Sequence, residues 1–154
     1  MIRFAKRGRV AAALSSLVLS LATLNNSAQA AGSVVHISSN SGGRIGEFMA
    51  RVDQYRTERV LVKFDGYCDS ACTLLLALPK SSSCVNTGAV FRFHAPMAAS
   101  AGTSLAAKHF LMAQYPGWVR NWIASNHGLT STLISMDYRY ASRFMRTCNE
   151  LASR

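Results

Sequence analysis

The pattern of apolar and polar positions after residue 31 changes its period several times, and each change predicts an element. Short apolar or β-branched runs predict strands at 34–37, at 60–64 and within 85–93. Between the first two strands, apolar residues recur at three- and four-residue steps, which predicts one face of a helix. These residues are Ile45, Phe48, Met49, Val52 and Tyr55. A second helix is predicted over 70–78, after the second strand, and Pro79 ends it.

This order of elements predicts the fold class. Strand, helix, strand, helix and strand within roughly sixty residues imply two crossover connections, and crossovers of that length join parallel strands. We therefore expect an α/β fold with a small, mostly parallel sheet and flanking helices, formed by a single domain over 31–154. From Thr103 onward the chain is predicted to be helical. The core residues expected there are Leu105, Phe110, Leu111, Trp118, Trp122, Ile123, Leu133, Ile134, Phe144 and Met145.

The first thirty residues follow a different pattern. Basic residues come first, and the fifteen residues 10–24 that follow them contain no charge. Ala28 and Ala30 then form a small-x-small ending, so this segment is typical of a secretory signal peptide with cleavage after Ala30. The apolar run is shorter than the about twenty residues of a spanning helix, and an uncleaved anchor is the alternative. We expect residues 1–30 to be removed on export, leaving no membrane span.

The charge balance changes once this segment is set apart. The whole chain has seventeen Lys and Arg, seven Asp and Glu, and a formal net charge of +10. Four of the basic residues precede residue 10, which leaves +6 for 31–154. The remaining basic residues are scattered among acids and form no stripe, which favours a solvated face or an anionic envelope over nucleic acid as a partner.

All four cysteines lie in 31–154, and an even number in an oxidising compartment predicts two disulfides. The candidates are Cys68, Cys72, Cys84 and Cys148, and the three possible pairings stay open. A zinc site of Cys68, Cys72, Cys84 and His94 is the alternative. It is disfavoured because the first two are not spaced as in a zinc knuckle and Cys148 is left over, so we expect no metal.

Candidate chemistry gathers where the predicted strands end. The segments SNSGG at 39–43, GYCDSAC at 66–72 and FHAP at 93–96 all follow strands, and ligands bind beyond the carboxyl ends of parallel strands. Ser70 opens a helix, and His94 on the neighbouring strand is placed to accept its proton. The N–H groups of Gly43 and Ala71 can form an oxyanion hole. Each feature alone has a structural explanation, such as a helix cap or a turn, and their conjunction carries the hypothesis.

These motifs resemble the Clp-protease and crotonase-like superfamily. The likeness rests on SNSGG, GYCDSAC and FRFHAP, with His94 placed 24 residues after Ser70, and it covers roughly 34–97. The chain resembles in particular an exported bacterial branch of this superfamily, in which a serine flanked by cysteines replaces the Clp turn. This resemblance implies that the exported protein resides in the periplasm or the medium of a bacterium. The resemblance implies hydrolysis of a peptide or other acyl bond, with Ser70 as nucleophile, His94 as general base and the amides of Gly43 and Ala71 as oxyanion hole.

Two departures from the family pattern affect these expectations. A triad needs a carboxylate to orient its histidine, and only Asp137 and Glu150 follow His94 in the chain. Asp137 is the candidate, although its alternative roles are a surface cap or an ion-pair partner of a nearby arginine. The family also begins with a further strand, so we expect an exposed sheet edge that a partner or a second copy covers.

The sequence is therefore compatible with two functions. The first is a small exported serine hydrolase that needs no cofactor and acts on a peptide or acyl substrate through Ser70 and His94. The second is a catalytically inactive relic of the same fold that binds a partner or serves a structural role in the envelope.

Overall fold

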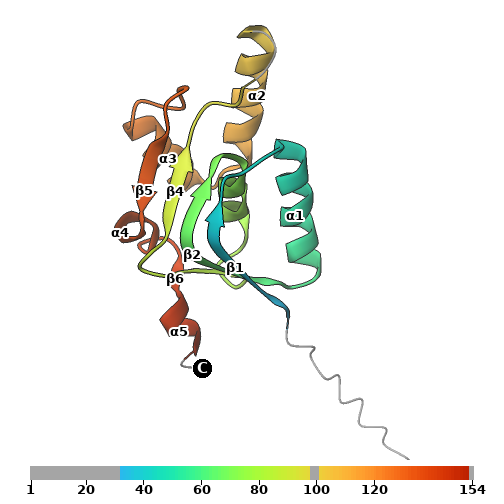
Figure 1. Cartoon of the computed structure of the whole chain (residues 1–154), viewed down its shortest axis with the longest axis vertical. Helices are drawn as coiled ribbons and strands as arrows, with labels where there is room; N and C mark the ends of the chain where they lie inside the picture. Colours follow the sequence, from blue (N-terminus) through green and yellow to red (C-terminus); the bar gives the residue numbers. More distant parts are fainter. Residues whose placement is uncertain (1–31, 98–100, 153–154) are drawn as a thin grey trace, which may run out of the picture. The chain divides into compact units, whose positions relative to one another are not determined.

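The computed structural model describes residues 32–97 and 101–152. The signal peptide predicted for 1–30 lies outside the described residues and stays a prediction. Figure 1 shows the helices and strands in chain order. They are β1 (Val34–Asn40), α1 (Ile45–Thr57), β2 (Leu61–Asp69), the 3₁₀ helix η1 (Ser70–Ala77), β3 (Ser83–Val85), β4 (Val90–Phe93), α2 (Ala101–Gln114), α3 (Gly117–Ser125), β5 (Ile134–Asp137), α4 (Tyr138–Ala141), β6 (Arg146–Thr147) and α5 (Cys148–Ala152).

Strand β2 is the centre of a six-stranded sheet. It pairs with β1 along one side, while on its other side β3 pairs with the first part and β4 with the last part. These pairs and β3–β6 are parallel, whereas β4–β5 is antiparallel. The predicted α/β class with a mostly parallel sheet is therefore confirmed.

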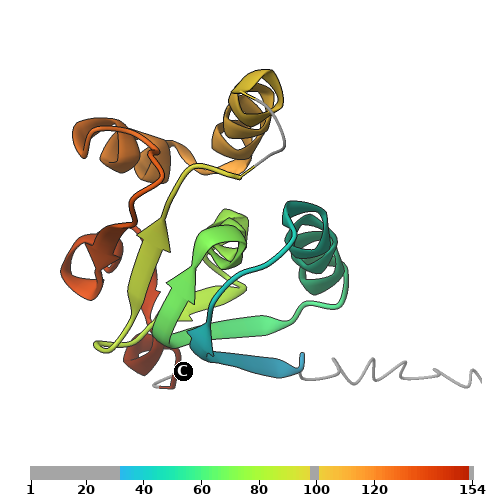
Figure 2. The same ribbon diagram turned by 45° about the horizontal axis from the view of Figure 1, so that its top comes forward.

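Helices α1 and η1 cover one face of this sheet, as the turned view in Figure 2 shows. The predicted face of α1 is confirmed, because Phe48 and Val52 are buried and Ile45, Met49 and Tyr55 pack against the core. Helix η1 is mostly apolar, and its residues from Ala71 to Leu76 are all buried. It packs against β2, β4 and α1, which explains why it has no polar face toward solvent.

The sequence misplaced several boundaries in the first half of the chain. Strand β2 continues to Asp69, so Ser70 follows a strand directly, where we expected a short loop between them. The predicted helix over 70–78 has 3₁₀ geometry, with tighter turns than an α-helix. The region 85–93 contains the end of one strand and the whole of another, because a turn closed by Ala89 N–H to Asn86 O separates β3 from β4.

The prediction of an all-helical second half was wrong. Strands β5 and β6 lie there, but they have only four and two residues, too few to show a period in the sequence. Leu105, Phe110 and Leu133 were expected in the core and are exposed. Leu111, Ile123 and Met145 are buried as expected, and Trp118 and Trp122 pack against the core.

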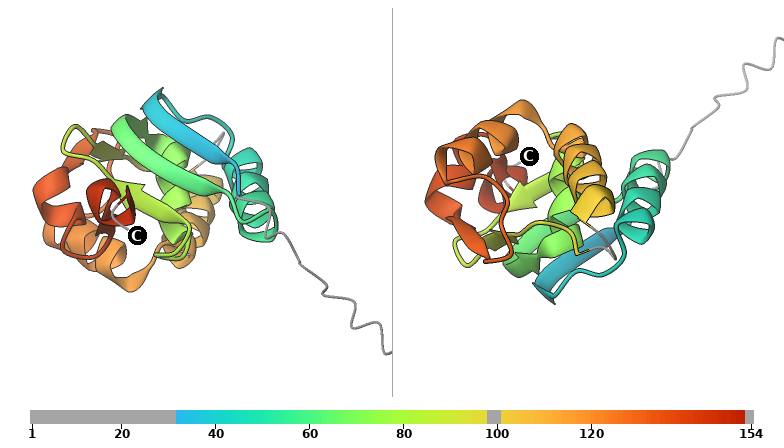
Figure 3. Two further views of the ribbon diagram at one scale, coloured as in Figure 1. Left: turned by 90° about the horizontal axis from the view of Figure 1, so that it is seen from below. Right: turned by 90° about the horizontal axis from the view of Figure 1, so that it is seen from above.

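Strand β1 forms an edge of the described sheet, since β2 is the one described strand with which it pairs. Figure 3 shows β1 at this margin from two opposite sides. The partner expected to cover the edge stays a prediction.

Among the helices of the described residues, none combines the length and the hydrophobicity of a membrane-spanning segment.

Candidate active site

The register of the parallel strands brings the three predicted segments to one edge of the sheet. Asn40 in β1 lies beside Cys68 in β2, and Asp69 lies beside Arg92 in β4. The residues just beyond these pairs are the glycine turn after β1, Ser70 after β2 and, two positions on from Arg92, His94 after β4. Parallel strands run the same way, so their carboxyl ends present these groups to the same region of space.

A pocket of about 320 Å³ opens at this edge. Its lining contains all four residues proposed from the sequence for the nucleophile, the base and the oxyanion hole: Ser70, His94, Gly43 and Ala71. The rest of the lining is mostly apolar and is supplied by Ile45, Pro96, Met97 and Leu111, with Arg44 beside them. The pocket therefore combines a serine and a histidine with an apolar wall that suits an apolar substituent.

Ser70 adopts a left-handed backbone conformation, with a φ of 53°. This conformation costs a residue other than glycine roughly 1–2 kcal/mol, and such strain is concentrated at functional sites. It turns the chain sharply from β2 into η1, which is the strand-to-helix geometry that exposes a nucleophilic hydroxyl in hydrolases.

Gly42 makes this turn possible by its lack of a side chain. It has a φ of 85°, and a Cβ placed there would come within 2.5 Å of the Asp69 carbonyl oxygen and 2.8 Å of Ser70 Cβ. Its N–H donates to Asn40 Oδ1 at 2.9 Å. The glycine turn therefore lies directly against Ser70, and a larger residue at position 42 would displace the serine.

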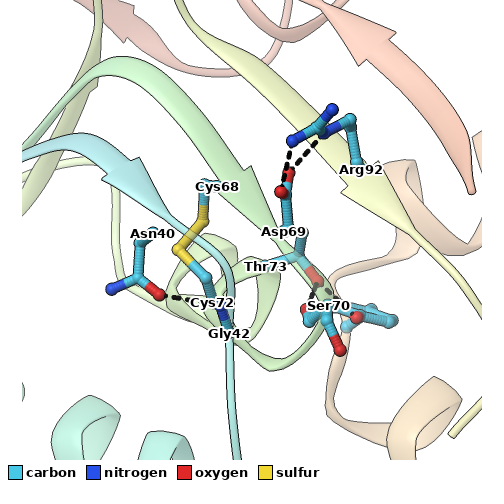
Figure 4. Close-up of a disulfide and its surroundings, with 9 residues drawn as sticks. Asn40, Gly42, Cys68, Asp69, Ser70, Cys72, Thr73 and Arg92 are labelled. Atoms are coloured by element: carbon cyan, nitrogen blue, oxygen red, sulfur yellow. Dashed lines mark hydrogen bonds and ion pairs between the residues drawn. A yellow bond between two sulfur atoms is a disulfide. The ribbon is translucent and has the colours of Figure 1, made fainter.

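The turn that carries Ser70 is fixed on both flanks (Figure 4). A disulfide joins Cys68 to Cys72, so the two residues on either side of Ser70 belong to one closed loop. Next to Ser70, the carboxylate of Asp69 accepts two hydrogen bonds from the guanidinium of Arg92, from Nε at 2.6 Å and from Nη2. These bonds raise the pKa of Arg92 above its ordinary value. The Arg92 guanidinium also stacks 4.5 Å above the ring centroid of Tyr67.

His94 is oriented by a backbone carbonyl. Its Nδ1 lies 2.7 Å from the Ala95 carbonyl oxygen. Since a carbonyl can only accept, Nδ1 carries the proton, and Nε2 is left as the basic nitrogen. The N–H of Ala95 donates to the Thr130 carbonyl at 2.6 Å, which ties the His94–Ala95 peptide, next to the one that carries the accepting carbonyl, to the segment before β5.

The two proposed oxyanion donors are free to bind a ligand. Within the described part of the chain, no acceptor is paired with the N–H of Gly43 or of Ala71. Ala71 is the second residue of η1, where backbone N–H groups lack partners in the helix. The pocket is therefore lined by two unpaired backbone donors beside the serine and the histidine.

The structure does not bring Asp137 to His94. Asp137 caps α4, where its Oδ1 accepts the N–H of Tyr140 at 3.0 Å. Because β5 runs antiparallel to β4, Asp137 pairs with Val90, at the far end of the strand from the histidine. Four residues of extended chain span roughly 13 Å, beyond the reach of a carboxylate. The cap role considered for Asp137 from the sequence is the one it has.

The four cysteines form two disulfides, as predicted. Cys68 pairs with Cys72, and Cys84 in β3 pairs with Cys148 at the start of α5, so the C-terminal segment is attached to the sheet. These bonds leave none of the cysteines as a thiolate, so the alternative zinc site with His94 is not formed.

Three residues that support the site were not predicted from the sequence. Arg92 binds Asp69, which directly precedes Ser70. Thr73 donates to the Ser70 carbonyl at 2.6 Å, and Tyr115 lies 2.6 Å from the Thr73 hydroxyl. The contact between Thr73 and Tyr115 joins residues 42 positions apart, which no local pattern predicts.

Comparison with known proteins identifies no family. No protein-family model matches the chain, and no curated protein does. Among solved structures, the chain is similar to the crystal structure of a peptidase from Plasmodium falciparum, with a TM-score of 0.45 and 12% sequence identity over 73% of each chain. A likeness of this extent does not identify a function, and the superfamily resemblance stays a prediction.

Proposed function

We propose that this protein is a small exported serine hydrolase that cleaves a peptide or another acyl bond. One observation carries the proposal: Ser70, His94, Gly43 and Ala71 line a single pocket. A strained serine, a histidine with a defined basic nitrogen and two unpaired backbone donors are the groups that acyl transfer requires.

The chemistry follows from the positions of these groups. Ser70 Oγ attacks the acyl carbon while Nε2 of His94 takes its proton, and the N–H groups of Gly43 and Ala71 bind the oxyanion that forms. His94 then returns the proton to the leaving group, and water hydrolyses the acyl-serine by the same route. Each oxyanion donor typically lowers the barrier by about 3 kcal/mol.

The orienting group in this proposal is the Ala95 carbonyl instead of a carboxylate. In a serine protease, loss of the correct histidine tautomer costs about 10⁴ in rate. The bond from Nδ1 to Ala95 O retains the tautomer, although a carbonyl carries less negative charge than a carboxylate and stabilises the imidazolium less. We therefore expect a slower enzyme than a complete triad would give.

The second function, a catalytically inactive binding or structural protein, also has an observation in its favour. In the described part of the chain, no hydrogen bond joins Ser70 to His94. Catalytic hydrogen bonds are often long before substrate binds, so this observation does not exclude the hydrolase. A measurement has to separate the two.

Labelling with a fluorophosphonate probe makes that separation. The hydrolase proposal expects labelling of the purified protein, none of Ser70→Ala and strongly reduced labelling of His94→Gln. Asp137→Asn is the matched control, because asparagine preserves the helix cap and labelling should be unchanged. Absence of labelling in folded wild-type protein would favour the inactive relic, and loss of labelling in Asp137→Asn would overturn the carbonyl-oriented histidine.

Export is part of the same proposal. Two disulfides are compatible with an oxidising compartment, where such bonds persist. Titration of the denatured, unreduced protein is expected to detect close to no free thiols. Detection of all four cysteines as thiols would overturn both the disulfides and export.

A further inference from the structure

Two buried hydroxyl groups lie directly behind the candidate nucleophile. Thr73 is fully buried and Tyr115 is 2% exposed. The Thr73 hydroxyl lies 2.6 Å from the Ser70 carbonyl oxygen and 2.6 Å from the Tyr115 hydroxyl, and Figure 4 shows Thr73 beside Ser70. Neither residue lines the pocket, so their placement needs an explanation other than contact with substrate.

The direction of both hydrogen bonds can be deduced. The Ser70 carbonyl can only accept, so the single hydroxyl proton of Thr73 is donated to it. Tyr115 must then donate its own proton to Thr73 Oγ1. Burial raises the pKa of Tyr115 above its ordinary value, which keeps it protonated as a donor. The chain therefore runs in one direction, from Tyr115 through Thr73 to the Ser70 carbonyl.

This carbonyl belongs to the same peptide group as the N–H of Ala71. A trans peptide is planar, and its C=O and N–H point in opposite directions. All peptides in the described chain are trans. Holding the Ser70 carbonyl toward the buried Thr73 hydroxyl therefore directs the Ala71 N–H the other way. Because Ala71 lines the pocket, that direction matters for an oxyanion.

We infer that Thr73 and Tyr115 are positioning residues that set the oxyanion hole by fixing the Ser70–Ala71 peptide. The inference rests on the proposed hydrolase function. Left-handed serine is strained, so the peptide needs an anchor to keep its orientation. Tyr115 also packs edge-on against Phe93, with ring centroids 5.7 Å apart, and Phe93 directly precedes the proposed base. One side chain thus supports the segments that carry both His94 and the nucleophile.

The test compares the maximal labelling rate and the half-saturating concentration of the fluorophosphonate probe. Thr73→Val removes the hydroxyl with little change in shape, and we expect the maximal rate to fall about 100-fold, as for loss of one oxyanion donor. Half-saturation should stay unchanged, because the pocket lining is intact. Tyr115→Phe leaves Thr73 able to donate and should lower the rate about tenfold. Thr73→Ser, which retains the hydroxyl, should restore most of the rate.

Ser83→Ala is the matched control. Ser83 is buried, and its hydroxyl donates to the Pro79 carbonyl at 3.3 Å, but it does not line the pocket. It should lose stability as Thr73→Val does and retain the labelling rate. Equal loss of rate in both variants, or failure of Thr73→Ser to restore it, would overturn the positioning role.

A crystal structure of Thr73→Val tests the inference even if wild-type protein is not labelled and the hydrolase proposal fails. We expect the Ser70–Ala71 peptide to rotate and Ser70 to leave the left-handed region. A Ser70 φ that stays near the wild-type 53°, with its carbonyl still pointing inward, would overturn the inference on its own.

Discussion

The two disulfides are expected to serve different purposes, and replacing each pair separately tests this. Cys68 and Cys72 are four residues apart in sequence, whereas Cys84 and Cys148 are 64 apart. A disulfide stabilises mainly by restricting the unfolded chain, and the restriction grows with the size of the loop that it closes. The relevant variants are Cys68→Ala with Cys72→Ala and Cys84→Ala with Cys148→Ala.

The sequence separations set the expected loss of stability. The loop-entropy relation gives about 2 kcal/mol for the short loop and about 4 kcal/mol for the long one at 25 °C. All four cysteines are buried, so replacement by alanine removes similar packing in both variants. The difference of about 2 kcal/mol in the free energy of unfolding is therefore the quantity to measure, by urea denaturation of each variant.

The expected effect on the site has the opposite order. The short loop carries Ser70, and releasing it allows the nucleophile to move. A misplacement of about 1 Å can cost 100-fold in rate, so we expect about that loss of fluorophosphonate labelling in the Cys68/Cys72 variant. The Cys84/Cys148 variant, while folded, should label within about twofold of wild type, since its bond joins β3 to α5, away from the pocket lining.

Either of two results would refute this reasoning. Equal losses of unfolding free energy in the two variants would show that loop size does not govern the stabilisation. Unchanged labelling in the folded Cys68/Cys72 variant would show that the disulfide around the serine does not position it.

Three further changes test the surroundings of the nucleophile. Gly42→Ala should reduce labelling about 100-fold, because the added Cβ would meet the turn that carries Ser70. Gly46→Ala, with nothing within 4 Å of the added carbon, should leave labelling unchanged, and similar labelling of both variants would contradict the close approach. Arg92→Gln leaves a partly buried carboxylate without its ion-pair partner and should lower both stability and labelling, while Arg51→Gln, an arginine over a ring without that carboxylate, should affect labelling little. Burial raises the pKa of Tyr115, so its contribution to stability is present below its ordinary value of 10.0 and is lost as pH rises above it. Urea titrations above pH 10 should show a decline of about 1.4 kcal/mol per pH unit that Tyr115→Phe lacks, and an unchanged slope in that variant would contradict the burial effect.

Much of the first half of the molecule could be predicted from its sequence. The apolar face of α1 repeats over 13 residues, and the runs that become β1, β2 and β4 are apolar or β-branched, so local patterns were long enough to be distinctive. Because crossover connections force these strands to be parallel, the sequence also predicted that Gly43, Ser70 and His94 would come to one edge of the sheet. The structure places all three in the lining of one pocket.

The strands of the second half could not be predicted from local patterns. Strands β5 and β6 are too short to establish a period, and these residues become strands because they pair with β4 and β3. The direction of β5 then determines where Asp137 lies. An antiparallel strand carries its last residue to the start of β4, so the acid caps α4 and the Ala95 carbonyl orients His94 instead.

What the sequence determined by itself was therefore set by local periodicity and by strand direction: the α/β class, the edge that carries the site, and the presence of two disulfides. The pairing of the cysteines, the bonds from Arg92 to Asp69 and the chain from Tyr115 through Thr73 to Ser70 were decided by the tertiary structure. Apart from the Cys68–Cys72 disulfide and the bond from Thr73 to Ser70, which are local, these contacts join residues from 23 to 64 positions apart, and only the packing of the whole chain brings such groups within bonding distance.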